Sequence, residues 1–370
     1  MSEIKQGYKQ TKVGIIPEDW EDIKIKDIVK VSQGLQIAID DRFTTPAHNR
    51  VFYITIPFIE GKKEEYIENP KSSTLCKKDD ILVVRTGSGV GKIIRGVEGA
   101  FHNNFFKVKP SDNINIDFFY YFLTSPRVQF LMAKYAGNSA IPDLNHGDFY
   151  SLDFLIPPLK EQEKIAEILT TWDKAITKQT ELLRAKELLK IALMQKLLSG
   201  EVRFDGFSDK WEEVKIKDIF EITRGYVLAV TEMSQEQTAE YKYPVYSSQT
   251  KNNGLTGYYK DYLFENCITW TTDGANAGDV NLRKGKFYCT NVCGVLKSDK
   301  GYANQCIAEI LNLVTKNYVS YVGNPKLMNN TMGGIKIKIP KSLPEQQKIA
   351  EVLSLADDEI NLLKNELEEL

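Results

Sequence analysis

The stretch Leu159–Ser199, LKEQEKIAEILTTWDKAITKQTELLRAKELLKIALMQKLLS, decides how this 370-residue chain is organised. It contains no Gly and no Pro, and apolar residues recur at alternating spacings of four and three, at Ile165, Leu169, Trp172 and Ile176. This spacing predicts a long helix that packs against another helix. At 1.5 Å per residue the helix would span roughly 60 Å. That is too long for one side of a small domain, so we expect a spacer.

A second copy of this helix follows near the C-terminus. Residues 345–353, EQQKIAEVL, match residues 161–169, EQEKIAEIL, at seven of nine positions with an offset of 184. The second apolar seam consists of Ile349, Leu353, Ala356, Ile360, Leu363, Leu367 and Leu370. Counted by the same offset, the second copy stops about 14 residues short of the first. Either a truncated chain or a naturally shorter helix accounts for this difference.

The segment before each helix also begins alike. Trp20–Gly34 and Trp211–Gly225 agree at eight of 15 positions, with an offset of 191. A repeat this long indicates two copies of a whole domain rather than a solenoid. We therefore expect a first domain at 1–155, a central spacer helix at 156–200, a second domain at 201–338 and a C-terminal spacer helix at 339–370.

Each globular half is predicted to be a strand-rich α+β fold. Runs typical of strands lie at 80–85, 105–109, 268–271 and 292–296. In each half a Gly-rich loop follows a strand, at 86–92 and 273–279, and a helical stretch comes later, at 117–136 and 302–321. A last strand, at 154–156 and 335–339, leads to the long helix. The sequence Ser342-Leu-Pro-Glu345 predicts a capping box at the start of the second one.

The charge is unevenly distributed along the chain. The net charge is −2, but residues 339–370 alone carry −5, so the acidity lies in the last helix. The segment Lys71–Lys109 has eight basic and three acidic residues, a local net charge of +5. Such a segment is either a solvated surface or an electrostatic contact for nucleic acid.

Composition points to a cytoplasmic protein. No run of about 18 apolar residues predicts a membrane span, and the polar N-terminus lacks the apolar core of a signal peptide. Five cysteines, an odd number, are expected to be free buried thiols in a reducing compartment: Cys76, Cys267, Cys289, Cys293 and Cys306.

Several motifs that suggest catalysis fail on inspection. Gly87–Lys92 resembles a phosphate-binding loop, but Thr86 replaces its first Gly, Ile93 replaces the magnesium-binding Ser or Thr, and a strand follows. Cys289 and Cys293 do not have zinc-knuckle spacing, and the histidines lack companions at metal spacing. No nucleophile–base arrangement is evident. We expect no catalytic residue, no metal site and no cofactor in this chain.

Polar and aromatic loops remain as candidates for function. Gln and Asn amides can bond adenine, and Arg and Lys can bond phosphate or guanine. We predict DNA contacts from residues of this kind in both halves: Arg85, Lys92, Arg95, Asn103, Asn104, Lys107, Arg224, Ser248, Gln249, Tyr258, Asn276, Arg283, Lys284 and Lys286. For each one taken alone, a solvated surface role is the competing interpretation.

These features together resemble the specificity subunit of type I restriction–modification systems. The resemblance rests on residues 156–169 and 339–353, on the paired Trp-Glu-x-x-Lys-Ile-Lys-Asp-Ile openings, and on Thr290–Val295. It covers essentially the whole chain, and the doubled arrangement makes it specific. The shorter second helix departs from the family pattern. It therefore affects how the C-terminus would complete the circular arrangement that the family implies.

The resemblance implies how this chain would work in a bacterial cell. Each half would be a target recognition domain that reads one half of a split double-stranded DNA site in the major groove. The two helices would pair antiparallel as a coiled coil that sets the gap. Modification (methyltransferase) subunits would bring S-adenosylmethionine for N6-adenine methylation. Restriction (translocase and endonuclease) subunits would bring ATP and Mg. This chain itself would be non-catalytic.

Two alternatives to this interpretation are kept open. One is a coiled-coil adaptor that organises proteins and does not touch DNA. The other is a recognition subunit of a related restriction class with the same two-domain plan. Replacing the loops at 71–109 or 246–283 separates the first alternative from DNA recognition, because only a DNA reader would change its sequence preference.

Overall fold

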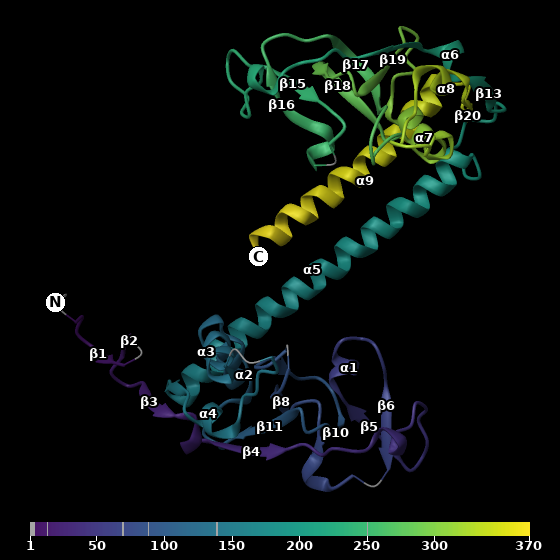
Figure 1. Cartoon of the computed structure of the whole chain (residues 1–370). Coiled ribbons are helices and arrows are strands. Elements are labelled where there is room, and N and C mark those ends of the chain that lie inside the picture. Colours follow the sequence, from purple (N-terminus) through teal and green to yellow (C-terminus); the bar gives the residue numbers. More distant parts are fainter. Residues whose placement is uncertain (1–3, 13, 69, 88, 138–139, 250) are drawn as a thin grey trace. The chain divides into compact units, whose positions relative to one another are not determined.

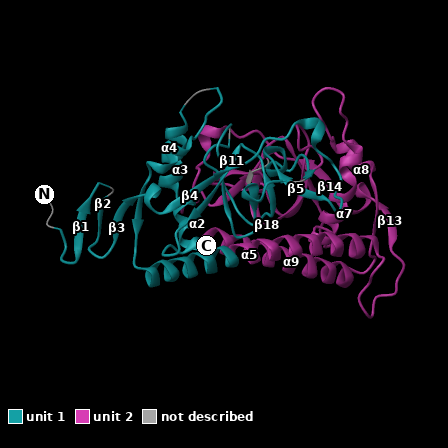
Figure 2. Cartoon of the chain, turned by 90° about the horizontal axis from the view of Figure 1, so that it is seen from below, with its two compact units in different colours: residues 1–175 teal, residues 176–370 magenta. Residues whose placement is uncertain are grey.

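The computed structural model describes residues 4–12, 14–68, 70–87, 89–137, 140–249 and 251–370. The chain divides into two compact units, residues 1–175 and 176–370 (Figure 2). Each unit contains one strand-rich domain, and each is described by itself below.

The first unit is built from short strands and a few helices (Figure 1). Its strands are β1 (Tyr8–Thr11), β2 (Gly14–Pro17), β3 (Glu21–Lys24), β4 (Val29–Gln33), β5 (Arg50–Ile54), β6 (Glu65–Glu68), β7 (Leu75–Cys76), β8 (Ile81–Val84), β9 (Ile93–Ile94), β10 (Gly99–Phe101), β11 (Phe105–Pro110) and β12 (Asp153–Ile156). Its α-helices are α1 (Ile56–Ile59), α2 (Ile116–Thr124), α3 (Pro126–Ala136) and α4 (His146–Tyr150), and the long helix α5 (Leu159–Ser199) begins in it.

Two four-stranded sheets form the centre of the first unit. Their strand orders are β6-β5-β10-β7 and β4-β11-β8-β9. Strand β8 is buried along its whole length, as its unbroken Ile-Leu-Val-Val sequence predicts for a central strand. Helices α2 and α3 pack against the second sheet through Phe119 and Met132, which are fully buried.

The second unit has one larger sheet, with the order β14-β19-β17-β18-β15-β16. The strands of this unit are β13 (Glu212–Lys215), β14 (Glu221–Arg224), β15 (Tyr243–Tyr246), β16 (Leu255–Tyr259), β17 (Phe264–Thr271), β18 (Val280–Cys289), β19 (Cys293–Lys297) and β20 (Lys336–Ile339). Its helices are α6 (Ile216–Ile219), α7 (Gln305–Thr315), α8 (Asn329–Gly334) and α9 (Leu343–Glu369), and α5 ends in it.

The same joint connects each domain to its long helix. In the first unit β3 pairs antiparallel with β12, with Glu21 opposite Ile156. In the second unit β13 pairs antiparallel with β20, with Glu212 opposite Ile339. Each pair joins the strand after the repeated Trp to the strand before the helix. The repeated sequence segments therefore form the same local structure.

Helix α9 runs antiparallel to the part of α5 that belongs to the second unit. Lys190 forms an ion pair with Asp357 at 2.5 Å and Lys186 with Glu359 at 2.6 Å, while Gln179 donates a hydrogen bond to Glu366 at 2.7 Å. Rising numbers on one helix thus face falling numbers on the other. The predicted pair of antiparallel helices is confirmed, together with the α+β class of the two domains.

The apolar seam of the helix pair differs on α5 from the predicted one. On α9, Ile349, Leu353, Ile360 and Leu363 are buried and Ala356 and Leu367 are half-buried, but the predicted Leu370 is exposed. On α5, Leu169, Trp172 and Ile176 are exposed, and Ile165 packs on the core of the first domain. An antiparallel pair places the end of α5 beside the start of α9. Leu193 and Leu197 therefore pack with Ile349 and Leu353 in one core.

Two local expectations need correction. The helical stretch predicted at 117–136 is two helices, because Pro126 disfavours helical backbone at Ser125 before it. The predicted capping box is absent, since the Ser342 side chain makes no capping bond. The Glu345 carboxylate instead accepts two hydrogen bonds from Arg203, at 2.8 and 2.7 Å.

Candidate nucleic-acid interface

Four loops of the first unit meet at one place. The backbone N–H of Arg85, after β8, donates to the Asn104 carbonyl between β10 and β11 at 2.7 Å. The N–H of Leu144, before α4, donates to the Arg85 carbonyl at 2.9 Å. The N–H of Leu35, after β4, donates to the carbonyl of Phe101, at the end of β10, at 3.0 Å. We call this meeting point the loop cluster of the first unit. The second unit has a loop cluster of its own.

The second unit builds the loop cluster again with equivalent contacts. The N–H of Thr272, after β17, donates to the Val292 carbonyl at 2.9 Å. The N–H of Leu327, before α8, donates to the Thr272 carbonyl at 2.9 Å. Tyr226, after β14, donates to the Cys289 carbonyl at 3.2 Å. The repeat in sequence is thus also a repeat in loop geometry.

The cations predicted for the first domain mostly have intramolecular partners. Arg85 forms a bidentate pair with Asp143, at 2.9 and 3.1 Å, and these bonds lower the pKa of the Asp143 carboxyl. Arg95 pairs with Asp117 at 2.6 Å, and Lys107 donates to the Leu75 carbonyl at 2.7 Å. Lys92 is exposed. Of these four, Arg85 lies in the loop cluster.

The predicted asparagines Asn103 and Asn104 lie directly in the loop cluster. The Asn103 amide donates to Gln36 Oε1 at 3.0 Å, and the Asn104 N–H donates to His102 Nδ1 at 3.0 Å. Burial and then the Arg42 charge lower the pKa of His102 to about 4. His102 is therefore neutral near pH 7 and can accept that hydrogen bond.

In the second domain the predicted residues divide into two groups. Arg224 is the last residue of β14 and lies in the loop cluster. The Asn276 amide donates to the Ser248 carbonyl at 3.1 Å, so Asn276 contacts the loop that contains Ser248 and Gln249. Tyr258 lies on β16. Neighbouring residues of a strand point to opposite faces. Lys284 and Lys286 are accordingly exposed, whereas Arg283 is buried.

The loop clusters contain buried polar residues of which the sequence analysis predicted only Arg224 and missed Gln33, His146 and Asn329. Among the described residues, four buried side-chain atoms lack a hydrogen-bond partner: Gln33 Oε1, His146 Nε2, Arg224 Nε and Asn329 Oδ1. Gln33 and Arg224 stand at equivalent places, each directly before the repeated Gly34 or Gly225. His146 and Asn329 each begin the short helix before the joint, α4 or α8. The sequence could have indicated Gln33, because it stands directly before the repeated Gly, as the predicted Arg224 does.

Exposed apolar residues lie on loops next to the clusters. Ile141 precedes α4, Tyr321 and Val322 precede α8, and Tyr226 and Val227 follow β14. Val322 is 93% exposed. Apolar side chains on a DNA-reading surface can contact the thymine methyl group. Sequence patterns did not mark these residues, because single apolar loop residues carry no periodicity.

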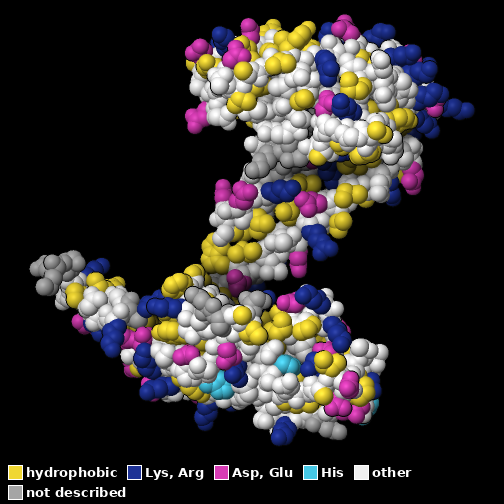
Figure 3. Space-filling view, in the orientation of Figure 1, with side chains coloured by type: hydrophobic (Ala, Val, Ile, Leu, Met, Phe, Trp, Pro, Cys, Tyr) yellow, Lys and Arg dark blue, Asp and Glu magenta, His cyan; other side chains and the backbone are white. Residues whose placement is uncertain are grey.

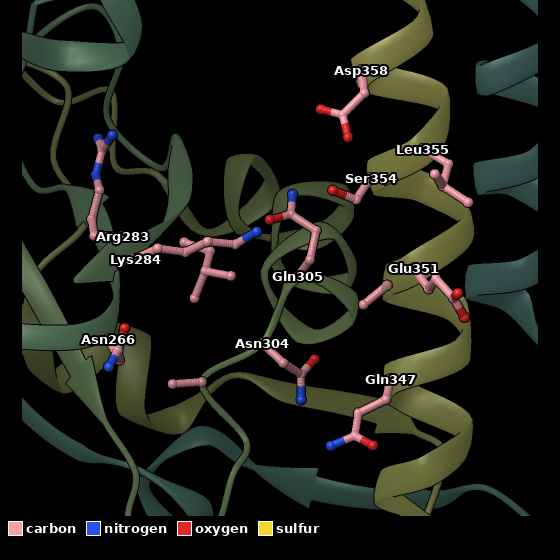
Figure 4. Close-up of a pocket in the computed structure, with 13 residues that line it drawn as sticks. Asn266, Arg283, Lys284, Asn304, Gln305, Gln347, Glu351, Ser354, Leu355 and Asp358 are labelled. Atoms are coloured by element: carbon pink, nitrogen blue, oxygen red, sulfur yellow. The ribbon is translucent and has the colours of Figure 1, made fainter.

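A groove of about 520 Å³ lies between α9, the start of α7 and the β17–β18 pair. Figure 4 shows Lys284 extending toward Gln305 and Ser354, whereas Arg283 is turned away from them. Arg283 lines both this groove and a second cavity of about 260 Å³, which Ser247 and Gln249 also line. Of these two neighbouring residues of β18, Lys284 lines the first groove alone, whereas Arg283 lines both.

The cysteines behave as buried thiols. All five are buried and free, as predicted. Burial raises the pKa of Cys76 and Cys293 to about 11 and that of Cys306 to about 12, so these thiols stay protonated at neutral pH. In the described part of the chain, no three His, Cys, Asp or Glu side chains are grouped to hold a metal ion. None of the described helices is both long and apolar enough to span a membrane.

Known proteins resemble this chain in sequence and fold. A putative type I specificity subunit N-terminus of Mycoplasma pneumoniae is 43% identical over 143 residues, 38% of this chain and 74% of that protein. Another putative type I specificity subunit of that organism is 34% identical over 206 residues, which are 55% of this chain and 81% of that protein. The type I S subunit crystal structure from M. genitalium has a TM-score of 0.64 at 19% identity, covering 95% and 92% of the two chains, which shows a shared fold.

The family model described as the type I restriction modification DNA specificity domain matches residues 17–185 and 208–370. The two matched segments correspond to the two copies of the repeat, and together they cover most of the chain. This chain therefore belongs to the type I restriction modification DNA specificity family.

Proposed function

We propose that each loop cluster reads one half of a split DNA site, so that this non-catalytic chain directs partner subunits to a bipartite sequence. The observation that supports this proposal is the duplicated loop cluster. The same backbone contacts recur in both units, from Arg85 to Asn104 and from Thr272 to Val292. Recognition of two half-sites requires two similar backbone arrangements that present polar side chains, and the two loop clusters provide them.

The side chains in the two loop clusters differ, which supports half-sites of different base sequence. Gln33 in one cluster is replaced by Arg224 in the other, and His146 by Asn329. A Gln oxygen accepts hydrogen bonds, while an Arg guanidinium donates them. Base pairs differ in their donor and acceptor pattern in the major groove. The clusters are therefore expected to prefer different bases.

Helices α5 and α9 would set the gap between the half-sites. Lys186, Lys190 and Glu187 on α5 form ion pairs with α9, which supports a stiff pair of helices. A rigid spacer holds the two recognition domains a fixed distance apart, which fixes the number of base pairs between the half-sites. The gap would therefore change with the length of the helices and not with the loops.

Catalysis would reside on partner subunits. We propose that modification subunits bring S-adenosylmethionine and methylate adenine at N6, and that restriction subunits bring ATP and Mg for translocation and cleavage. Membership of the specificity family supports this division of labour. Leu188, Leu189 and Ile191 of α5 are exposed and would offer contact area to such partners. Figure 3 shows that apolar side chains reach the surface of the long helices.

Genome-wide mapping of methylated adenine tests the proposal. Cells with this chain and its partner subunits should methylate one motif of two short blocks separated by a gap of fixed length. Cells without the chain should lose that motif. Replacing residues 201–338 by those of another family member should change one block and leave the other block and the gap unchanged.

The same measurement separates the competing adaptor role. If loop replacements at 71–109 and at 246–283 both leave the motif unchanged, the loops do not read DNA and the chain is an adaptor. A single contiguous motif would contradict the spacer.

A further inference from the structure

Arg283 occupies an unusual position on β18. It is 7% exposed, although arginine is rarely buried without a partner. Its Nε donates to Thr269 Oγ1 at 3.0 Å, and its guanidinium lies 3.7 Å from the centre of the Tyr246 ring. Arg283 also forms a side-chain hydrogen bond with Tyr246. Thr269 and Tyr246 together fix the plane of the guanidinium, which has further N–H groups for a ligand.

No carboxylate neutralises Arg283. Within the described residues no ion pair includes it, whereas Arg42 pairs with Glu65 and Arg203 with Glu345. Burial lowers the pKa of Arg283, but arginine keeps its proton in proteins. A buried charge without a counter-charge costs folding free energy. A negatively charged ligand would remove that cost.

The cavity beside Arg283 suits an anion. It measures about 260 Å³ and is lined mainly by neutral polar side chains: Ser247, Gln249, Asn253, Thr271, Asn281 and Asn312. Asp279 also lines it, but its carboxylate pairs with Lys316 at 2.5 Å. The cavity therefore combines one unpaired cation with several hydroxyl and amide groups able to donate.

The cavity adjoins the loop cluster of the second unit. Thr290 Oγ1 donates to Ser247 Oγ at 2.9 Å, and Asn276 donates to the Ser248 carbonyl at 3.1 Å. Thr271, which lines the cavity, directly precedes Thr272 of the cluster. A DNA strand that meets the cluster would therefore pass close to the cavity.

We propose that Arg283 and the neutral donors around it bind a phosphate of the DNA backbone next to the second half-site. A phosphate supplies the missing negative charge and matches the fork of a guanidinium. A phosphate contact positions a protein on the duplex and does not read bases. This inference rests on the proposed function and adds the contact that would set the register of the second domain.

The first variant is Arg283→Met, which removes the charge and keeps a long side chain. Because the buried charge is uncompensated, we expect Tm to rise or to fall by less than about 4 °C. A structural arginine would instead lower Tm by more than this. Lys284→Met is the matched control for this thermal measurement alone, since Lys284 is the exposed neighbour on β18 and is itself a predicted DNA contact.

The decisive measurement uses the full chain assembled with its modification subunits on a duplex that contains its motif. One phosphate at a time in the second half-site is replaced by an uncharged methylphosphonate. At one linkage the parent should lose about 10- to 100-fold in affinity. Arg283→Met should show a similar loss on ordinary DNA and no further loss at that linkage. Its salt slope, log K against log salt, should be about 0.9 smaller.

A second pair of variants changes only the charge of two exposed side chains. Asn253→Asp places a carboxylate on the cavity wall at nearly unchanged size, and Asn252→Asp places the same charge on the neighbouring exposed residue, which does not line the cavity. Asn253→Asp should abolish the effect of the same methylphosphonate, and Asn252→Asp should not.

Four outcomes would overturn the inference. Arg283→Met could bind as the parent does at every linkage, which would leave the proposed function intact. It could relax the preference for one base without changing the salt slope, which would make Arg283 a base reader. It could lower Tm beyond the stated limit. Finally, inorganic phosphate could raise the Tm of the parent and not that of Arg283→Met while no linkage responds, which would indicate a site for free phosphate.

Discussion

Two buried glutamines hold the long helices to their domains. Gln162 is 1% exposed, donates to the Pro157 carbonyl at 2.9 Å and accepts from the Asn115 N–H at 2.9 Å. Gln346 is fully buried, donates to the Pro340 carbonyl at 2.8 Å and accepts from the Asn304 amide at 2.8 Å. Each glutamine thus links its helix to the segment before it and to a helix cap.

Gln346→Leu should destabilise the second unit by about 2 kcal/mol. The change leaves the Pro340 carbonyl buried without a donor, and an orphaned buried polar group costs about 1–3 kcal/mol. The exposed neighbour Gln347 provides the control, because Gln347→Leu should change the free energy of unfolding by less than about 0.5 kcal/mol. Urea unfolding measures both variants, and equal midpoints would show that the Gln346 hydrogen bonds contribute nothing.

His102 should make the stability of the first domain depend on pH. Its pKa is about 4 in the folded chain, owing to burial, and about 6.5 when unfolded. Below pH 6.5 the unfolded chain therefore binds the proton more readily, and stability falls as pH drops from about 6.5 to 4, by about 2 kcal/mol after screening.

Replacement of the histidine tests this pH dependence. His102→Gln should flatten the stability profile between pH 4 and 6.5, measured by urea unfolding at each pH. His48 is exposed and serves as the control, since His48→Gln should leave the profile unchanged. A profile that stays equally steep in His102→Gln would assign the titration to another group.

At the scale of elements, the helix pair of the second unit combines an apolar seam with charged flanks. Ile360 and Leu363 are 6% and 7% exposed, and they lie between residues of α9 that form ion pairs with α5. Surface ion pairs contribute little to stability, typically less than about 1 kcal/mol each. The buried apolar residues should therefore hold the helices together, and the charges should favour the antiparallel direction.

Ile360→Ala should lower the stability of the second unit by about 2–4 kcal/mol, because it leaves a cavity in the seam. Leu362→Ala makes a similar truncation on the exposed face of the same helix, where Leu362 is 58% exposed. It should change stability by less than about 0.5 kcal/mol. Thermal unfolding followed by circular dichroism compares them, and a comparable loss in both would mean that α9 does not pack through Ile360.

At the scale of the whole molecule, the chain consists of two compact units that share one continuous helix. Each unit has its own core, with Phe119 in one and Trp270 in the other among the fully buried aromatic residues. Substitutions in separate cores usually act independently. The two loop clusters can therefore be altered one at a time.

Calorimetry should reveal two unfolding transitions. Gln162→Leu should lower one of them by about 4–8 °C, and Gln346→Leu should lower the other by a similar amount, given about 2 kcal/mol each. The double variant should show both shifts without an extra loss. A single transition that both variants shift together would mean that α5 couples the units into one cooperative body.

The sequence alone was sufficient to predict the doubled plan, the two long helices and the α+β domains. Similar segments, such as those that begin at Trp20 and Trp211, form the same joint twice because short-range patterning decides local structure. Periodicity also predicted the buried face of α9. It did not locate the seam on α5, where Trp172 is 49% exposed, because spacing identifies an apolar face and not the partner that covers it.

Only the tertiary structure decided which candidate residues act together. Arg85 is 58 residues from Asp143 in the chain, and their pairing depends on how distant loops meet. The structure also distinguished Arg283, which is buried without a counter-charge, from its exposed neighbour Lys284. Local spacing specifies helices and strands, but the neighbours of a side chain across the fold depend on long-range packing, which no short motif records.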